Sequence, residues 1–295
     1  MLRDAPNKSC SNYDAFMAST VSNLKVPIHS FLVASRSTVL TDAIASAQRT
    51  GSWDCEVLSI SITEQGTTLF LFKGLDSLTL IELVLYVYTD AFVGFWLRSR
   101  EALHLAHRYR QIRIEIMKVA GRLDLRNLES AARRMTKWDE AEKSLNLDLE
   151  VALAHWSFLD GGDVVVQLAD GEQLMHSDLM SRRCPFFEGL FKGRTGGGWL
   201  QGRRDTLQDS EDVVSVDFTH VELSTFRLVL RHLYADTGEE LFDDIVADDL
   251  DEYLDIVLDV LSLANELMLD RLSQICQWVL GQHGEMMMIS GRDHC

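Results

Sequence analysis

Two short segments carry residue types that serve catalysis or ligand binding in other proteins. His104-x-x-His107 presents two imidazoles, but no glutamate general base separates them and no third metal ligand lies nearby. Thr195-Gly196-Gly197-Gly198 lacks the Lys-Ser/Thr that completes a phosphate-binding loop, which favours a flexible connection. No serine or cysteine lies in a nucleophile elbow. The sequence therefore predicts no enzyme, with no catalytic residue, no cofactor and no metal site.

Composition narrows the class of partner. The net charge of −17 disfavours nucleic acid, because phosphate backbones need a positive footprint. Five cysteines without a C-x-x-C pair indicate reduced intracellular thiols. The first residues have no apolar signal region, and no long apolar run indicates a membrane span. We expect a cytoplasmic or nuclear protein that binds neither nucleic acid nor membrane.

The elements that would position a binding site occur twice. Three segments recur in the same order at nearly constant offsets: His29–Arg36 and His176–Arg183 at 147 residues, Tyr88–Asp90 and Tyr234–Asp236 at 146, and Val119–Leu125 and Leu263–Leu269 at 144. Such self-similarity is typical of a duplicated structural unit. The chain is therefore predicted to contain one unit twice.

The second copy predicts a sheet followed by helices. Residues 163–168 have the β-branched composition of a strand, Asp170-Gly171 suits a tight turn, and 173–175 can return as the partner strand. Residues 213–218 indicate a third strand. With the helical patterns between and after them, the order is β-β-α-α-β-α-α-α. This predicts an α+β fold, a small β-sheet capped by a cluster of helices.

Helix boundaries in this copy have recognisable signals. Pro185 suits the first turn of a helix and Gly193 a left-handed end. Thr219 and Glu222 have the spacing of a capping box that introduces the next helix. Gly281 is the predicted stop of the last helix, with an irregular tail after it.

These residues resemble the BTB/POZ family in both copies. The second copy carries the segments Asp163-Val164, His176-x-x-Leu179, Pro185-Phe186-Phe187, Leu233-Tyr234-x-Asp236 and Leu263-Ala264-x-x-Leu267. The first copy keeps His29-x-x-Leu32-x-Ala34-x-Arg36-Ser37, Val87-Tyr88-Thr89-Asp90 and Ala120-x-x-Leu123. Its first strand is degraded, so that Tyr13-Asp14-Ala15-Phe16 stands in for it, and an insertion precedes Val26-Pro27.

The resemblance implies two tandem BTB/POZ folds with defined boundaries. We expect a disordered segment at 1–11, a first domain at 12–136, a helical linker at 137–160 and a second domain at 161–283. The remaining tail, 284–295, is predicted to be truncated or non-native. The tandem arrangement is most similar to the inhibitor of Bruton tyrosine kinase family, whose members resemble cullin-3 adaptors with ankyrin and RCC1-type repeats upstream. Neither repeat array is present in this sequence.

Binding to cullin-3 would use the loop after the second helix. In BTB domains that bind this scaffold, the loop carries a hydrophobic-x-Glu element, and Leu207-Gln208-Asp209 departs from it by the shorter carboxylate. Trp199, among glycines and arginines, suits an interface hot spot, and packing of Trp199 onto its own domain is an equal alternative. The predicted partner-binding residues are Phe191, Trp199, Leu200, Leu207 and Asp209.

Two further features bear on partners. Transcriptional BTB repressors pair an aspartate at the Asp163 position with an arginine after the histidine. Here Ser177 takes that place and the first copy lacks the aspartate, which disfavours a repressor. Charge runs of opposite sign follow the two Tyr-x-Asp segments, and exposed helix faces explain them most simply. They could also orient a copy–copy contact through Arg108, Arg110, Arg113, Asp243, Asp244 and Asp248.

The predicted function is protein–protein interaction, as a substrate-adaptor component of a cullin-3-type ubiquitin ligase. Upstream repeats would then hold the protein substrate. The alternative is a self-associating scaffold or kinase-signalling inhibitor with no ligase role, in which homodimers or copy–copy contacts form.

Overall fold

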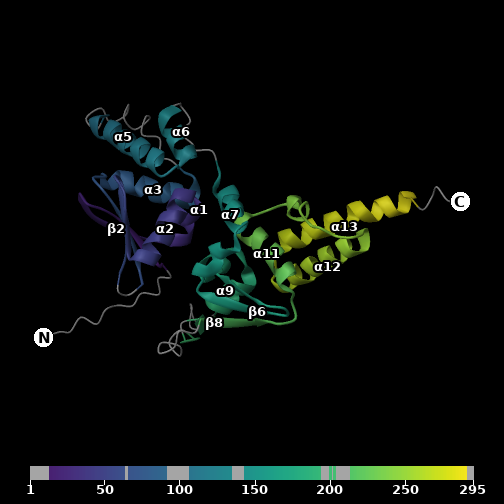
Figure 1. Ribbon diagram of the computed structural model, residues 1–295. Helices are drawn as coiled ribbons and strands as arrows, with labels where there is room; N and C mark the ends of the chain where they lie inside the picture. Colours follow the sequence, from purple (N-terminus) through teal and green to yellow (C-terminus); the bar gives the residue numbers. More distant parts are fainter. Residues whose placement is uncertain are drawn as a thin grey trace. The chain divides into compact units, whose positions relative to one another are not determined.

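The computed structural model describes residues 13–63, 66–91, 106–134, 143–193, 199–200, 202–203 and 213–290. The chain divides into two compact units, Met1–Ala152 and Leu153–Cys295, and the division falls inside the predicted linker. Each unit combines a small mixed sheet with several helices (Figure 1). The predicted α+β class is confirmed.

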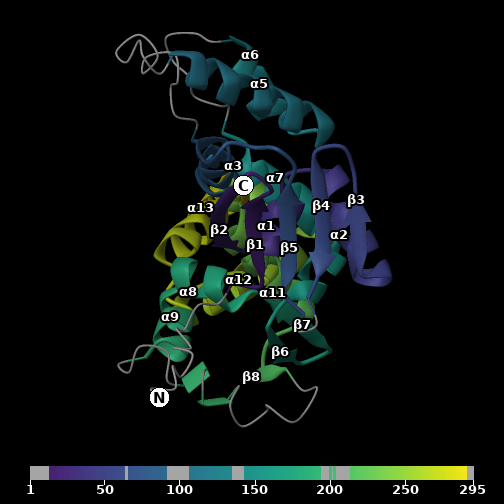
Figure 2. The same ribbon diagram turned by 90° about the vertical axis from the view of Figure 1, so that its left-hand side faces the viewer.

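The sheet of unit 1 has five strands in the order β2-β1-β5-β4-β3 (Figure 2). Their bounds are β1 Ala15–Ser19, β2 Ser22–Ile28, β3 Ser52–Asp54, β4 Leu58–Ile62 and β5 Thr68–Phe72. The central strand β1 pairs antiparallel with β2 and parallel with β5. Alternate residues of β1 and β5 are buried, as expected for strands that turn one face to a core.

Helices cover this sheet and extend beyond it. They are α1 Ser30–Ser35, α2 Thr38–Thr50, α3 Ser77–Thr89, α5 Ala106–Arg122, α6 Arg126–Arg134 and α7 Leu145–Leu153. Helix α2 packs on β3 and β4, and α3 packs on β1 and β2. Local signals set their ends: the Ser37 hydroxyl caps α2, and Gly51 ends that helix at a φ of 83°.

Unit 2 follows the predicted element order. Its parts are the 3-10 helix η2 Trp156–Gly161, strands β6 Val164–Leu168, β7 Glu172–Met175 and β8 Val214–Phe218, and helices α8 Ser177–Arg183, α9 Pro185–Phe191, α11 Leu223–Ala235, η3 Glu239–Phe242, α12 Leu250–Glu266 and α13 Asp270–Ser290. Strand β6 pairs antiparallel with β7 and parallel with β8, as β1 does with β2 and β5. Pro185 opens α9, and Gly193 has the predicted left-handed φ of 50°.

A tyrosine hydroxyl ties the first helix of each unit to a later one. In unit 1 the hydroxyl of Tyr88 accepts the backbone N–H of His29 at 2.9 Å and lies 2.7 Å from Nδ1 of that histidine. In unit 2 Tyr234 binds His176 in the same way, at 3.0 and 2.7 Å. Buried polar atoms need such partners, so the repeated histidine has the structural role that its repetition predicts.

The ends of corresponding helices share their backbone geometry. Asp90 after α3 and Asp236 after α11 have φ values of 55° and 56°. Asp124 and Met268, before the final helices, have φ values of 52° and 58°. Left-handed residues other than glycine are uncommon, so their recurrence at matching positions shows that both segments turn alike.

The first strand of unit 1 is more regular than expected. Residues 15–19 form a full strand, β1, and the predicted insertion before Val26 is the longer partner strand β2. The prediction that this copy lacks the aspartate is wrong. Asp14 accepts hydrogen bonds from the backbone N–H and hydroxyl of Ser30, as Asp163 does from Ser177. The longer β2 shifts the spacing between aspartate and histidine by two residues, which hid the match.

Two predicted helix boundaries are also wrong. Glu222, not Thr219, precedes α11, and the Asp170 carboxylate accepts the N–H of Leu223 at 2.7 Å instead of a local capping box. The helix predicted to stop at Gly281 continues to Ser290. Gly281 lacks the positive φ of a left-handed helix end, and an interior glycine costs a helix only about 1 kcal/mol relative to alanine.

A buried arginine anchors the last helix of unit 1. The side chain of Arg36 is fully buried and pairs with Asp90 and, at 2.7 Å, with Asp148 on α7. The second oxygen of Asp90 accepts the N–H groups of Ser144 and Leu145 at 3.0 and 2.9 Å. Burial raises the pKa of Asp148 despite the nearby guanidinium. The return of α7 thus supplies part of what this buried charge requires.

Replacement of Arg36 tests this anchor. Arg36→Met leaves two carboxylates without their cation, so we expect a loss of about 3–5 kcal/mol in the free energy of unfolding. Arg133→Met is the control, because Arg133 forms only a solvent-exposed pair with Glu129 on the same helix, worth less than about 1 kcal/mol. Urea denaturation followed by circular dichroism measures both. Equal losses would contradict a structural role for the buried pair.

Candidate functional site

An aromatic stack leads from the core of unit 2 to its surface. Phe187 lies against Phe218 of β8, with 6.1 Å between ring centroids, and stacks on Phe191 at 5.4 Å and 20°. Trp199 stacks on Phe191 at 6.1 Å and 23°. The guanidinium of Arg203 lies 5.8 Å from the Trp199 ring, within the range of a cation–π contact.

The two alternatives for Trp199 prove to be compatible. Its ring packs onto its own unit, yet the residue stays partly exposed, whereas Phe191 and Leu200 are 1% and 5% exposed. Phe191 and Leu200 therefore lie in the core and support Trp199 instead of presenting their own side chains. Leu207 and Asp209 lie outside the described residues, so their part in binding stays a prediction.

The arginines of the proposed charge-complementary surface have contacts within unit 1. Arg108 pairs with Asp76 at 2.9 Å, and Arg113 donates to the carbonyl oxygens of Ala132 and Arg133 at 2.8 and 3.0 Å. Arg110 is exposed. Two of the three arginines thus stabilise local structure, which weakens them as candidates for a copy–copy contact.

The acidic residues of that surface lie between η3 and α12. Asp243, Asp244 and Asp248 are exposed, and Asp244 is 3.5 Å from Arg231 of the same unit. Asp249 caps α12, where negative charge is favourable. Part of the acidic run therefore has a local explanation, and the copy–copy contact remains a prediction.

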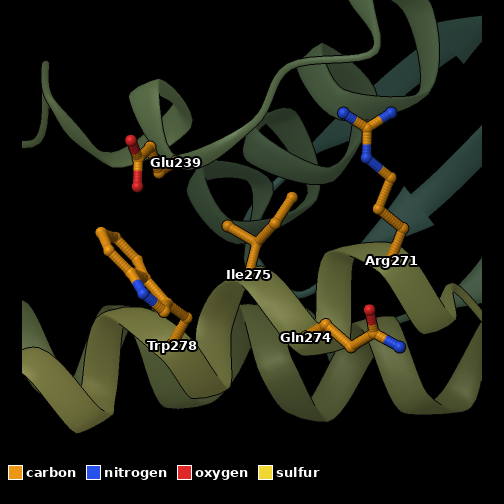
Figure 3. A pocket seen from close by; sticks show the side chains of 5 residues that line it. All are labelled: Glu239, Arg271, Gln274, Ile275 and Trp278. Atoms are coloured by element: carbon orange, nitrogen blue, oxygen red, sulfur yellow. The ribbon is translucent and has the colours of Figure 1, made fainter.

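A shallow pocket on unit 2 was not predicted from sequence. Arg271, Gln274, Ile275 and Trp278 of α13 line it, and Glu239 of η3 faces them (Figure 3). Its volume is about 400 Å³, and 51% of Trp278 is exposed. Positions 271, 275 and 278 share one helix face, opposite the buried Cys276 and Val279. A tryptophan among glutamines on the polar side of a helix was the available signal.

Catalytic chemistry finds no support in the described part of the chain. Among those residues, no group of three His, Cys, Asp or Glu side chains could hold a metal ion, and His104 lies outside them. Burial raises the pKa of the Cys184 thiol and that of Cys276 to about 12, so neither is an activated nucleophile. No helix in this part is both long and apolar enough for a bilayer.

Comparison with known proteins identifies a distant relative. The chain is 25% identical over 254 residues to BTB/POZ domain-containing protein 1 of Schizosaccharomyces pombe. The chain is a distant homologue of a BTB/POZ protein. The match covers 84% of this chain and 17% of the relative, so this chain spans a small part of that protein. No protein-family profile matches the chain. The BTB/POZ homology indicates a protein-interaction module, a class that is typically non-catalytic.

The aromatic stack predicts unequal effects of two truncations. Phe191→Ala removes a buried ring and should lower the stability of unit 2 by about 3–5 kcal/mol. Trp199→Ala should cost clearly less, because the ring loses contact on one side only. Urea denaturation of both variants measures the difference. A loss at Trp199 as large as that at Phe191 would make Trp199 a core residue and remove it from the candidate site.

Proposed function

We propose that the chain is an adaptor of a cullin-3-type ubiquitin ligase, and that unit 2 binds the scaffold. The observation that carries this is a partly exposed tryptophan held on a rigid aromatic stack, in a chain homologous to a BTB/POZ protein. Trp199 precedes Leu207-Gln208-Asp209, the counterpart of the hydrophobic-x-Glu element.

A pre-packed tryptophan suits a binding hot spot on physical grounds. Binding normally costs about 0.5–1.5 kcal/mol for each flexible side chain that becomes ordered. Trp199 has already lost much of this freedom through its contacts with Phe191 and Arg203. A helix of the scaffold that covers its exposed side would gain apolar burial with little further ordering. The substrate would bind a part of the longer protein outside this chain.

A self-associating scaffold is the second candidate function. The half-exposed Trp278 beside Ile275 favours it, because large exposed aromatic side chains concentrate at protein interfaces. Light scattering separates the candidates, since a scaffold of this kind forms dimers or larger species in the absence of a cullin.

Binding to the N-terminal region of cullin-3 tests the adaptor proposal. We expect the unmodified chain to bind, and Trp199→Ala and Leu207→Ala each to weaken the affinity by at least about ten-fold, the effect of losing a hot spot. Trp278→Ala is the matched control, because it removes the same side chain from another surface and should leave cullin affinity unchanged. Calorimetry gives all four affinities.

Two outcomes would overturn the proposal. One is no binding by the unmodified chain, and the other is equal weakening by Trp199→Ala and Trp278→Ala. A chain that self-associates without binding cullin would favour the scaffold.

A further inference from the structure

The two units differ at one pair of corresponding residues. Arg36 and Arg183 each lie seven positions after the repeated histidine, and Asp90 and Asp236 each lie two positions after the repeated tyrosine. Both aspartates have the same left-handed backbone conformation at the end of a helix. Unit 1 therefore provides an internal template for the same place on unit 2.

In unit 1 helix α7 fills this place. Asp148 in its first turn pairs with Arg36, and its first N–H groups bind Asp90. The hydroxyl of Ser144 also donates to Asp148 at 3.1 Å, and Leu149 on the next turn is fully buried. The occupant thus brings a carboxylate to the arginine, amide donors to the aspartate, and an apolar residue behind them.

In unit 2 both polar groups retain binding capacity. Arg183 donates to the carbonyl oxygens of Leu233 and Tyr234 at 3.0 and 2.7 Å, and no described carboxylate lies within ion-pair distance of it. One oxygen of Asp236 pairs with Arg271, and no described donor binds the other. The Asp236 side chain is 46% exposed, so that oxygen is accessible.

The path of the chain explains the difference. In unit 1 the final helix α6 ends at Arg134, and the chain returns as α7. In unit 2 the corresponding helix α13 continues to Ser290 without a return (Figure 1). Among the residues that the structure describes, none takes the place of α7 beside Arg183.

We propose that the Arg183–Asp236 site of unit 2 binds the N-terminal end of a partner protein's helix that has the pattern Ser-x-x-x-Asp-Leu, as α7 does. The incoming aspartate pairs with Arg183, and the first N–H groups of the helix bind Asp236. Charge-assisted bonds of this kind are stronger than neutral ones. Arg271 connects the site to the pocket, because it pairs with Asp236 and also lines the pocket beside Ile275 (Figure 3). The pocket then receives apolar side chains of the same helix.

A peptide copied from α7 tests the site in the intact chain. Residues 143–153, N-acetylated and fluorescently labelled, carry all three features of the occupant. We expect saturable one-to-one binding by fluorescence anisotropy. A peptide with Asp148→Asn should bind at least about ten-fold more weakly, because it loses the charge that pairs with the arginine. This comparison requires no change in the protein.

Variants of the protein locate the binding. Arg183→Gln should weaken the peptide by at least about ten-fold. Arg183→Lys should lie between, since it keeps the charge but loses the forked geometry. Arg182→Gln is the matched control, because Arg182 is exposed and pairs with Asp178, and it should leave peptide affinity unchanged.

Three results would overturn the proposal. The first is no saturable binding of the peptide. The second is binding that Arg183→Gln leaves unchanged, since the peptide would then displace α7 from Arg36. The third is a drop in the oligomeric mass of the peptide-free chain on Arg183→Gln, which would make the occupant a second copy of this chain.

Discussion

A guanidinium that is removed from water must be compensated by nearby acceptors, and Arg36 imposes this requirement on unit 1. The carboxylate of Asp90 supplies part of the compensation, and Asp148 supplies more only because α7 returns to the end of α3. The ring of Tyr86 lies 4.4 Å from the guanidinium and completes its surroundings. One buried charge therefore couples the first helix, a left-handed helix end and the last helix of the unit.

Unit 2 keeps the frame of unit 1 and changes what surrounds its arginine. The tyrosine–histidine contact and the aspartate–serine contact recur with nearly the same distances. Arg183 is less buried than Arg36 and relies on backbone carbonyls, and burial lowers its pKa. The same architecture is thus closed by its own chain in one unit and leaves polar binding capacity in the other. Such a difference is consistent with an interaction module in which the two units have separate roles.

Local patterns predicted the frame well, and long-range packing accounts for what they missed. The repeated histidine and Tyr-x-Asp segments identified the residues that tie helices together, because each copy needs the same contacts. Asp14 was missed because a longer β2 changed its spacing from His29. Phe191 was predicted to touch a partner, but its burial depends on Phe187 and on a loop whose path the sequence does not specify. The openness of the Arg183 site depends on where α13 runs, which no local pattern encodes.

The exchange of arginine side-chain protons with water tests the central claim most directly, that α7 closes the Arg36 site while the matching site stays open. Nitrogen-15 NMR of the intact chain, with Arg183→Lys to assign the second signal, measures both guanidinium groups in one sample. Exchange from a closed site requires local opening, so the Arg36 protons should exchange at least about ten-fold more slowly than those of Arg183. Equal exchange rates for the two arginines would contradict the account.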